Sequence, residues 1–153
     1  KMMGVCLRYS NSRENAEDLL HDGFIQVFTH ISSYQGKGSF EGWLRRIFVN
    51  LALQNFREEK KSKLINSDVS DLNIEIVDHV DESIEDIMGI SNSDILKMIN
   101  ELPQGYKIVF NLYVFEDMSH REIGQMLGIT EASSRSQYSR AKSFLKKKIQ
   151  TIL

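Results

Sequence analysis

The sequence predicts an all-α protein, made of two small helical domains joined by a flexible acidic linker. Apolar residues recur at three- and four-residue steps near both ends of the chain, and no segment shows the strict alternation of a strand. Between these periodic stretches lies a run rich in aspartate and glutamate with few aromatic residues. We therefore place the first domain at residues 1–62, the linker at 63–92 and the second domain at 93–153.

The distribution of charge supports the same division. The net charge of the 153-residue chain is −2, which is unusual for a protein that binds nucleic acid. Residues 1–64 hold 10 Lys and Arg against 7 Asp and Glu, residues 65–100 hold 1 against 9, and residues 101–153 hold 8 against 5. Two mildly basic domains therefore flank a strongly acidic segment, and each basic domain is a candidate for binding a polyanion.

Three helices are expected in the first domain. Residues 2–9 have the pattern of the end of a helix. The second helix starts at Asn11 or Ser12, either of which can cap it, and a stretch rich in glycine and serine at 32–39 ends it. Ser39 is a natural cap for the third helix. Gly23 lowers the helix propensity of the second helix for no reason visible in the sequence. The apolar face of the second helix consists of Ala16, Leu19, Leu20, Phe24, Val27, Phe28 and Ile31. That of the third helix consists of Phe40, Trp43, Leu44, Ile47, Phe48, Leu51 and Phe56.

In the acidic linker only a short helix near 84–88 is predicted. Four helices are expected in the second domain. The first ends before Pro103, because a proline disfavours helical geometry in the residue before it. The second covers residues 106–115. Ser119 and Glu122 form a capping box that opens the third, and Gly128 ends it. Thr130 caps the last helix, which runs to about Ile152.

Residues 119–140 have the anatomy of a helix-turn-helix: a short capped helix, a tight glycine turn, and a second helix that starts with small, polar residues. Such residues can enter the major groove, where arginine and glutamine read guanine and adenine edges and lysines contact phosphates. An antiparallel helix pair with a solvated charged face is the alternative, and Glu131 would repel phosphate. The candidate DNA-binding residues are Ser133, Ser134, Arg135, Ser136, Gln137, Arg140 and Lys142.

A second candidate nucleic-acid surface lies in the first domain, where aromatic residues alternate with cations. Tyr34, Phe40 and Trp43 lie close in sequence to Lys37, Arg45, Arg46 and Arg57, a combination that suits single-stranded DNA. Phe40 and Trp43 also fall on an apolar stripe and could equally be core residues, so Tyr34 is the better stacking candidate. On the preceding helix, Glu14, Asp18 and Asp22 share one face, which is either solvated or docks on a basic protein partner.

Two sets of motifs stand near the two ends of the chain. The first is AEDLLHDGFIQVF at 16–28, followed by FxxWLxRIxxN at 40–50 and by Arg57. The second is Leu102-Pro103 and SxxEIGxxLGI at 119–129, followed by Arg135-Ser136 and Arg140-Ala141-Lys142. In this order the two sets resemble region 2 and region 4 of the extracytoplasmic-function (ECF) subfamily of bacterial RNA polymerase sigma factors. The recognition helix departs from the pattern, since Ala132-Ser133-Ser134-Arg135 stands where the family usually has glycine-threonine-valine-lysine.

This resemblance implies a division of roles between the domains. Region 2 would dock on the clamp helices of the largest polymerase subunit through Asp18, Asp22, Phe24 and Gln26. It would also melt the −10 promoter element and capture a flipped base in the loop at 32–39, with Tyr34, Lys37, Arg46, Asn50 and Arg57. Region 4 would read the −35 element as duplex DNA and touch the polymerase flap. The resemblance further implies an anti-sigma factor as a partner.

Two other classes of function are weighed against this one. A helix-turn-helix regulator that binds DNA alone as a dimer needs a dimerisation surface, and none is obvious. An enzyme is disfavoured because His21, His30, His79 and His120 are scattered without metal-ligand spacing and no nucleophile or phosphate-loop motif is present. We expect Cys6 to be a buried structural thiol, and we expect no cofactor, no metal, no membrane insertion and a cytoplasmic location.

Overall fold

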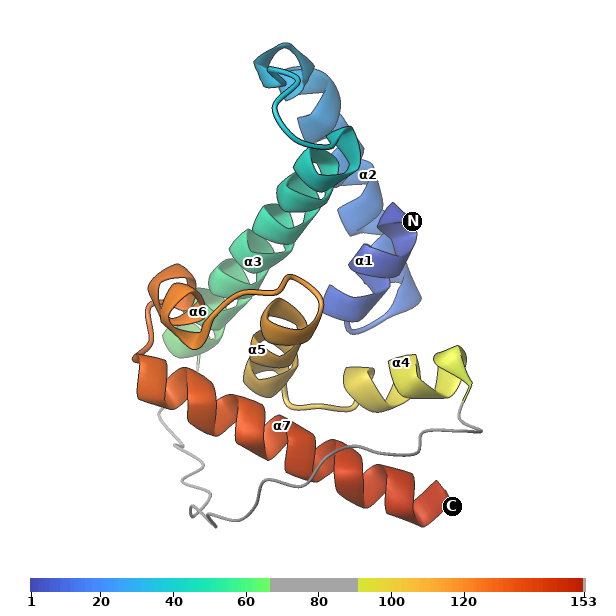
Figure 1. The fold of residues 1–153 in the computed structure, drawn as a ribbon, viewed down its shortest axis with the longest axis vertical. Helices are drawn as coiled ribbons and strands as arrows, with labels where there is room; N and C mark the ends of the chain where they lie inside the picture. Colours follow the sequence, from blue (N-terminus) through green and yellow to red (C-terminus); the bar gives the residue numbers. More distant parts are fainter. Residues whose placement is uncertain (67–90, 153) are drawn as a thin grey trace.

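The computed structural model describes residues 1–66 and 91–152, and this part of the chain is helical, as predicted (Figure 1). The first half contains α1 (Met2–Tyr9), α2 (Arg13–His30), the short 3-10 helix η1 (Ile31–Ser33) and α3 (Phe40–Asn66). The second half contains α4 (Asn92–Asn100), α5 (Gln104–Val114), α6 (His120–Leu127) and α7 (Glu131–Ile152). The short helix expected near 84–88 lies outside the described residues, as does most of the predicted linker.

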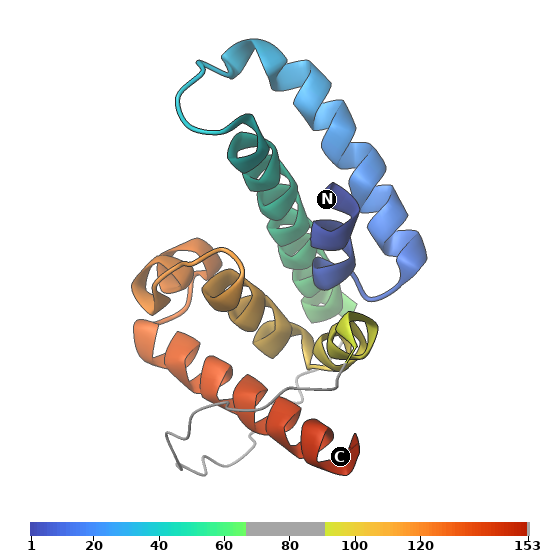
Figure 2. The same cartoon turned by 45° about the vertical axis from the view of Figure 1, so that its right-hand side comes forward.

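In the first half, α2 and α3 run in opposite directions and are joined at one end of the molecule by η1 and the loop after it (Figure 2). The side chain of Ser12 accepts a hydrogen bond from the backbone N–H of Asn15, so it is Ser12 that caps α2. Ser39 accepts from the backbone N–H of Gly42 at 3.0 Å and caps α3 as predicted. Helix α3 continues to Asn66, past the domain boundary predicted at residue 62.

Gly23, which had no explanation in the sequence, is required by the packing of α2 against α3. The ring of Phe48 is fully buried and lies directly against this glycine. A Cβ atom at position 23 would come within 2.0 Å of Cε1 of Phe48, a distance that no real contact reaches. Phe24 then packs edge-on against the same ring, with the centroids 5.4 Å apart. The close approach of α2 to α3 at this point therefore depends on a residue without a side chain.

The predicted caps of the second half are confirmed. Both hydrogen bonds of the capping box are present, since the hydroxyl of Ser119 accepts from the N–H of Glu122 and the Glu122 carboxylate accepts from the N–H of Ser119. Gly128 ends α6 in the left-handed conformation, with φ of 68°. The Thr130 hydroxyl accepts from the N–H of Ser133 and caps α7. Helix α4 ends at Asn100, before Pro103.

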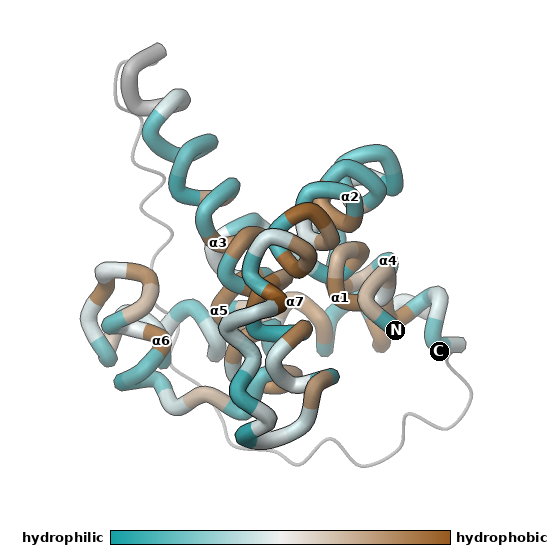
Figure 3. The backbone as a smooth tube through the Cα atoms, turned by 90° about the horizontal axis from the view of Figure 1, so that it is seen from above, coloured by the Kyte–Doolittle hydropathy of each residue, from teal (hydrophilic) through white to brown (hydrophobic). Residues whose placement is uncertain are grey.

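The two halves pack on each other around one core, an arrangement that the sequence did not predict. Buried residues of α1, α2 and α3 form a continuous apolar cluster with Ile108, Val109 and Leu112 of α5 and Ile123 of α6. In Figure 3, hydrophobic residues of α1 and α5 lie toward the middle of the molecule. Helix α5 is the centre of the second half, because it contacts α1, α6 and α7. Two polar residues of α5, Lys107 and Asn111, are fully buried.

We expect the substitution Gly23→Ala to lower the free energy of unfolding by about 1–3 kcal/mol, the usual cost of forcing an extra carbon into a packed core. Phe48 has to move, and the gain in helix propensity is too small to compensate. Urea unfolding followed by circular dichroism measures the change. Gly4→Ala is the matched control, because Gly4 also lies in a helix but a Cβ there meets no atom within 4 Å. Equal stability of the two variants would contradict the packing argument.

Candidate nucleic-acid interface

Helices α6 and α7 form the predicted helix-turn-helix. The turn between them is tight, because a Cβ atom at Gly124 would lie 2.8 Å from the backbone oxygen of Ile129. The N–H of Ile129 donates to the Gly124 carbonyl at 3.0 Å, which closes the turn behind Gly128. The angle between the two helices therefore depends on two glycines, one for the close contact and one for the left-handed turn.

The start of α7 presents one strong base-reading candidate, Arg135, whose side chain is exposed. Its guanidinium donates a hydrogen bond to the carboxylate of Glu131, one turn earlier on the same helix. The hydrogen bond and positive charge of Arg135 lower the pKa of Glu131. Glu131, which the sequence suggested would repel phosphate, is thus partly neutralised by its neighbour, and the two side chains form a single exposed group.

The prediction that Ser134 contacts DNA is wrong, because the structure buries this residue completely. Its hydroxyl lies 3.0 Å from Nδ1 of His120, so the two side chains share a hydrogen bond across the helix pair. His120 is half-buried rather than solvated, and its ring stacks on Tyr113 with the centroids 4.5 Å apart. Burial, and then the positive charge of Arg135, lower the pKa of His120. Ser134 fixes the rotation of α7 instead of reading bases.

Gln137, Arg140 and Lys142 are only partly exposed, because each makes a contact within the second half. Gln137 donates to the hydroxyl of Ser133 at 3.4 Å. Arg140 donates to the hydroxyl of Tyr106 at 3.3 Å, which ties α7 to α5. The ammonium group of Lys142 lies 5.1 Å from the ring centroid of Tyr138. Their DNA contacts, like that of the half-buried Ser136, remain predictions.

The loop between α2 and α3 carries a cluster of three aromatic rings. Tyr34, Phe40 and Trp43 meet with centroid separations of 5.2, 5.4 and 5.6 Å. The Tyr34 hydroxyl donates to the Gly38 carbonyl at 3.0 Å, which closes the loop over an exposed Lys37. Phe40 remains 43% exposed. The sequence left Phe40 and Trp43 open between core and platform. The structure places both beside Tyr34, with Phe40 exposed and Trp43 partly buried against the core.

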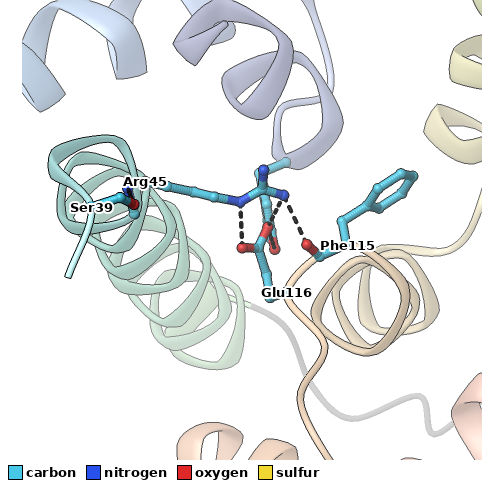
Figure 4. A network of polar contacts seen from close by, with 6 residues as sticks. Ser39, Arg45, Phe115 and Glu116 are labelled. Carbon is cyan, nitrogen blue, oxygen red and sulfur yellow. Dashed lines mark hydrogen bonds and ion pairs between the residues drawn. The ribbon is translucent and has the colours of Figure 1, made fainter.

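Helix α3 carries the cationic residues expected beside this loop. Arg46 and Asn50 are exposed. Arg57 donates to the backbone carbonyl of Met126, on α6. Arg45 also turns toward the second half, where its guanidinium donates to both carboxylate oxygens of Glu116 at 2.7 and 3.0 Å, and to the Phe115 carbonyl at 2.9 Å (Figure 4). These contacts between the halves were not predicted from the sequence.

The predicted protein-docking residues all lie on α2. Asp18, Asp22, Phe24 and Gln26 are all exposed. Apolar side chains continue this surface, with Ile25 51% and Phe28 74% exposed. Several exposed apolar side chains on one helix suit a protein interface. Asp18 and Asp22 also line a polar cavity of about 310 Å³ between α2, α3 and the start of α5.

No arrangement suited to a metal ion occurs among the His, Cys, Asp and Glu side chains of the described residues. Within the same residues, no helix combines the length and the apolar character needed to cross a bilayer. The thiol of Cys6 is fully buried, and burial raises its pKa to about 11.

Known families and proteins resemble both halves of the chain. The family described as Sigma-70 region 2 matches residues 1–62, and Sigma-70, region 4 matches residues 92–145. The ECF RNA polymerase sigma factor SigE of Mycolicibacterium smegmatis is 32% identical over 144 residues, which cover 93% of this chain and 54% of that protein. The ECF sigma factor SigW of Bacillus subtilis is 26% identical over 159 residues, which cover 99% of this chain and 84% of that protein.

Among solved structures, the sigma factor RpoE of Bartonella quintana, crystallised with the anti-sigma factor NepR, has a TM-score of 0.58 with this fold. The match covers 97% of this chain and 89% of that protein at 16% identity, so it is a likeness of fold. The chain spans about half the length of the M. smegmatis relative and most of the length of the B. subtilis relative.

Proposed function

The chain belongs to the sigma-70 family, among the ECF RNA polymerase sigma factors, and we propose that it binds core polymerase with α2 and reads a promoter with two separate surfaces. The loop between α2 and α3 would hold the melted −10 strand, and α7 would read the −35 duplex. The observation that carries this proposal is the presence, on one chain, of an exposed aromatic cluster beside cations and a capped helix-turn-helix.

Duplex reading is supported by the geometry of α6 and α7. The glycine turn holds α7 at a fixed angle, and the hydrogen bond between buried Ser134 and half-buried His120 fixes its rotation. The exposed side of its first turns then presents Glu131 and Arg135 to solvent. Arg135 can donate two parallel hydrogen bonds to a guanine, while Glu131 can accept from a cytosine amino group.

Capture of a single strand is supported by the aromatic cluster of Tyr34, Phe40 and Trp43. Its rings lie beside the loop that joins α2 and α3, and Lys37 and Arg46 are exposed near them. Bases stack on such rings with little dependence on sequence, while the phosphates follow the positive charge. Gly36 and Gly38 have φ of 71° and 79°, so the loop shape that closes on Tyr34 requires glycine at both positions.

Docking on polymerase is supported by the exposed acidic and apolar residues of α2. Asp18 and Asp22 lie one turn apart, and Phe24 and Phe28 follow on the exposed surface. A basic coiled-coil surface with apolar side chains would complement them. We also propose an anti-sigma factor as a partner, since the sigma factor of similar fold is bound to one.

The whole proposal is tested by transcription with purified chain, sigma-free core polymerase and fragmented genomic DNA from the source bacterium. We expect discrete start sites that share two upstream motifs at a fixed spacing. If the protein binds duplex DNA alone and core polymerase gains no start sites from it, the proposal fails. The result would then indicate a regulator that acts without polymerase.

Replacing the proposed base reader, Arg135→Ala, should weaken binding to the −35 element by about 1–3 kcal/mol and relax preference at one base pair. Competition binding of holoenzyme to promoters that differ at single −35 positions measures both effects. The double variant Arg135→Ala with Glu131→Ala separates the lost contact from the repulsion of an unpaired carboxylate. Arg13→Ala, which removes an exposed arginine of α2, is the control. An unchanged preference at every position would remove Arg135 from the readout.

The double variant Asp18→Asn with Asp22→Asn should weaken binding to core polymerase, because it removes two charges from the docking surface and changes the side-chain shape very little. We expect a loss of about 10-fold or more at low salt that shrinks as salt is added. Titration of core polymerase with labelled protein measures it. Glu41→Gln with Asp117→Asn, which removes two exposed charges elsewhere, is the matched control. Equal affinities of the two double variants would refute the docking role.

A further inference from the structure

A titratable contact lies where α6 meets the start of α7. His120 is the first residue of α6, and Ser134 lies in the first turn of α7. Ser134 is fully buried, and its hydroxyl lies 3.0 Å from Nδ1 of the half-buried His120 ring. A buried hydroxyl is costly without a partner, so this hydrogen bond is a condition for packing α7 in the observed rotation.

Two tyrosine rings hold the imidazole of His120 in place. It stacks on Tyr113 of α5, with the centroids 4.5 Å apart and the planes 13° apart, and its centroid lies 5.6 Å from that of Tyr138 on α7. The two tyrosines also contact each other, with their centroids 4.4 Å apart. Because α5 and α7 both pack on the ring, the direction in which Nδ1 meets Ser134 is fixed, and with it the rotation of α7.

The neutral and protonated forms of His120 are not equivalent in this contact. The neutral imidazole can accept a hydrogen bond from the Ser134 hydroxyl through Nδ1, whereas the imidazolium can only donate there. Protonation would then force the buried O–H of Ser134 to find another acceptor. The new charge would also lie at the first residue of α6 and beside the first turn of α7, the positive ends of two helices.

The surroundings of His120 oppose its protonation. Burial lowers the pKa of His120 most, the positive charge of Arg135 lowers it further, and Glu131 acts in the opposite direction. Glu131 is itself hydrogen-bonded to Arg135, so these two charges largely offset each other and burial dominates. The remaining ionisable groups around the ring are Tyr113 and Tyr138, which pack on it, and Arg121 and Glu122, which follow it on α6. Since the native pKa lies below 6.5, the packed arrangement is favoured at neutral pH and weakens as the pH falls.

We propose that His120 is a positioning residue for the recognition helix, and that reading of the −35 element requires its neutral form. The inference rests on the proposed function, because it concerns the same surface of α7. Protonation breaks the contact with Ser134, the residue before Arg135, and so moves the proposed base reader out of register with the base edges. Acid should therefore weaken −35 reading, whereas added positive charge on a DNA-binding protein would by itself strengthen binding.

Competition binding of holoenzyme to a promoter and to the same promoter with a scrambled −35 element gives the −35 preference. We would measure it between about pH 5 and pH 8, the range in which histidine titrates. As the pH falls below 6.5, the preference of the wild type should decrease, by at most about tenfold per pH unit, the limit for one proton. His120→Asn places an amide near the position of Nδ1 without a titrating charge, so it should keep most of the preference and lose the pH dependence.

Two further variants separate the hydrogen bond from the shape of the side chains. His120→Leu leaves the Ser134 hydroxyl buried without its partner and should reduce the −35 preference at every pH. Adding Ser134→Val to His120→Leu makes both sides of the contact apolar and should restore the preference, again without pH dependence. Thermal unfolding of each variant, followed by circular dichroism, shows whether it is folded at the pH of the binding measurement.

Nuclear magnetic resonance of the free protein with isotope-labelled histidine follows the ring directly, and the signal missing from His120→Asn identifies it. This signal should titrate below 6.5. Titration at or above that value, or the same pH profile of the −35 preference in the wild type and in His120→Asn, would overturn the inference, while the preference itself leaves the proposed function intact. A holoenzyme without any −35 preference at neutral pH would refute the proposed function, and this inference with it.

Discussion

Hydrogen bonds from two buried polar residues of α5, Lys107 and Asn111, to the end of α1 and the turn after it fix how the second half sits on the first, within the apolar core that the two halves share. Helix α5 carries both residues and also forms the surface on which α6 and α7 pack. A buried amine of this kind is costly, and burial lowers the pKa of Lys107. The cost is offset only while the carbonyl of Ser10 and the side chain of Asn11 remain within reach. The orientation of the recognition helix is thereby coupled to a turn in the other half.

Glycine has a different use in each half. In the first half it allows an aromatic ring to lie directly on a helix backbone, as Phe48 does at Gly23. In the second half it brings two helices together at Gly124 and reverses the chain at Gly128. The first use sets the spacing of α2 and α3, and hence the position of the aromatic loop that joins them. The second sets the angle of α7. Both proposed DNA surfaces therefore depend on positions where a single methyl group would not fit or would strain the backbone.

Local signals predicted most of the fold. The capping box at Ser119, the glycine stop at Gly128 and the break at Pro103 each act within a few residues, so the sequence alone locates the helix ends. Burial of Ser134 could not be predicted, because the rotation of α7 is fixed by His120 and Tyr138, whose rings meet only in the folded structure. Arg45 and Glu116 are 71 residues apart, and no sequence pattern connects them. The reason for Gly23 likewise lies in another helix, at Phe48.

The chain contains a single tryptophan, Trp43, and the fold places it in the aromatic loop. Its ring centroid lies 5.4 Å from that of Tyr34 and 5.6 Å from that of Phe40, so its surroundings change whenever that loop rearranges. Tyrosines of the second half, such as Tyr113 and Tyr138, stack with each other and with His120 instead. Selective excitation of the indole therefore gives fluorescence from Trp43 alone, beside the loop that joins α2 and α3. The protein therefore carries its own optical reporter at the junction of the aromatic loop and the core, since Trp43 is also partly buried against the core cluster.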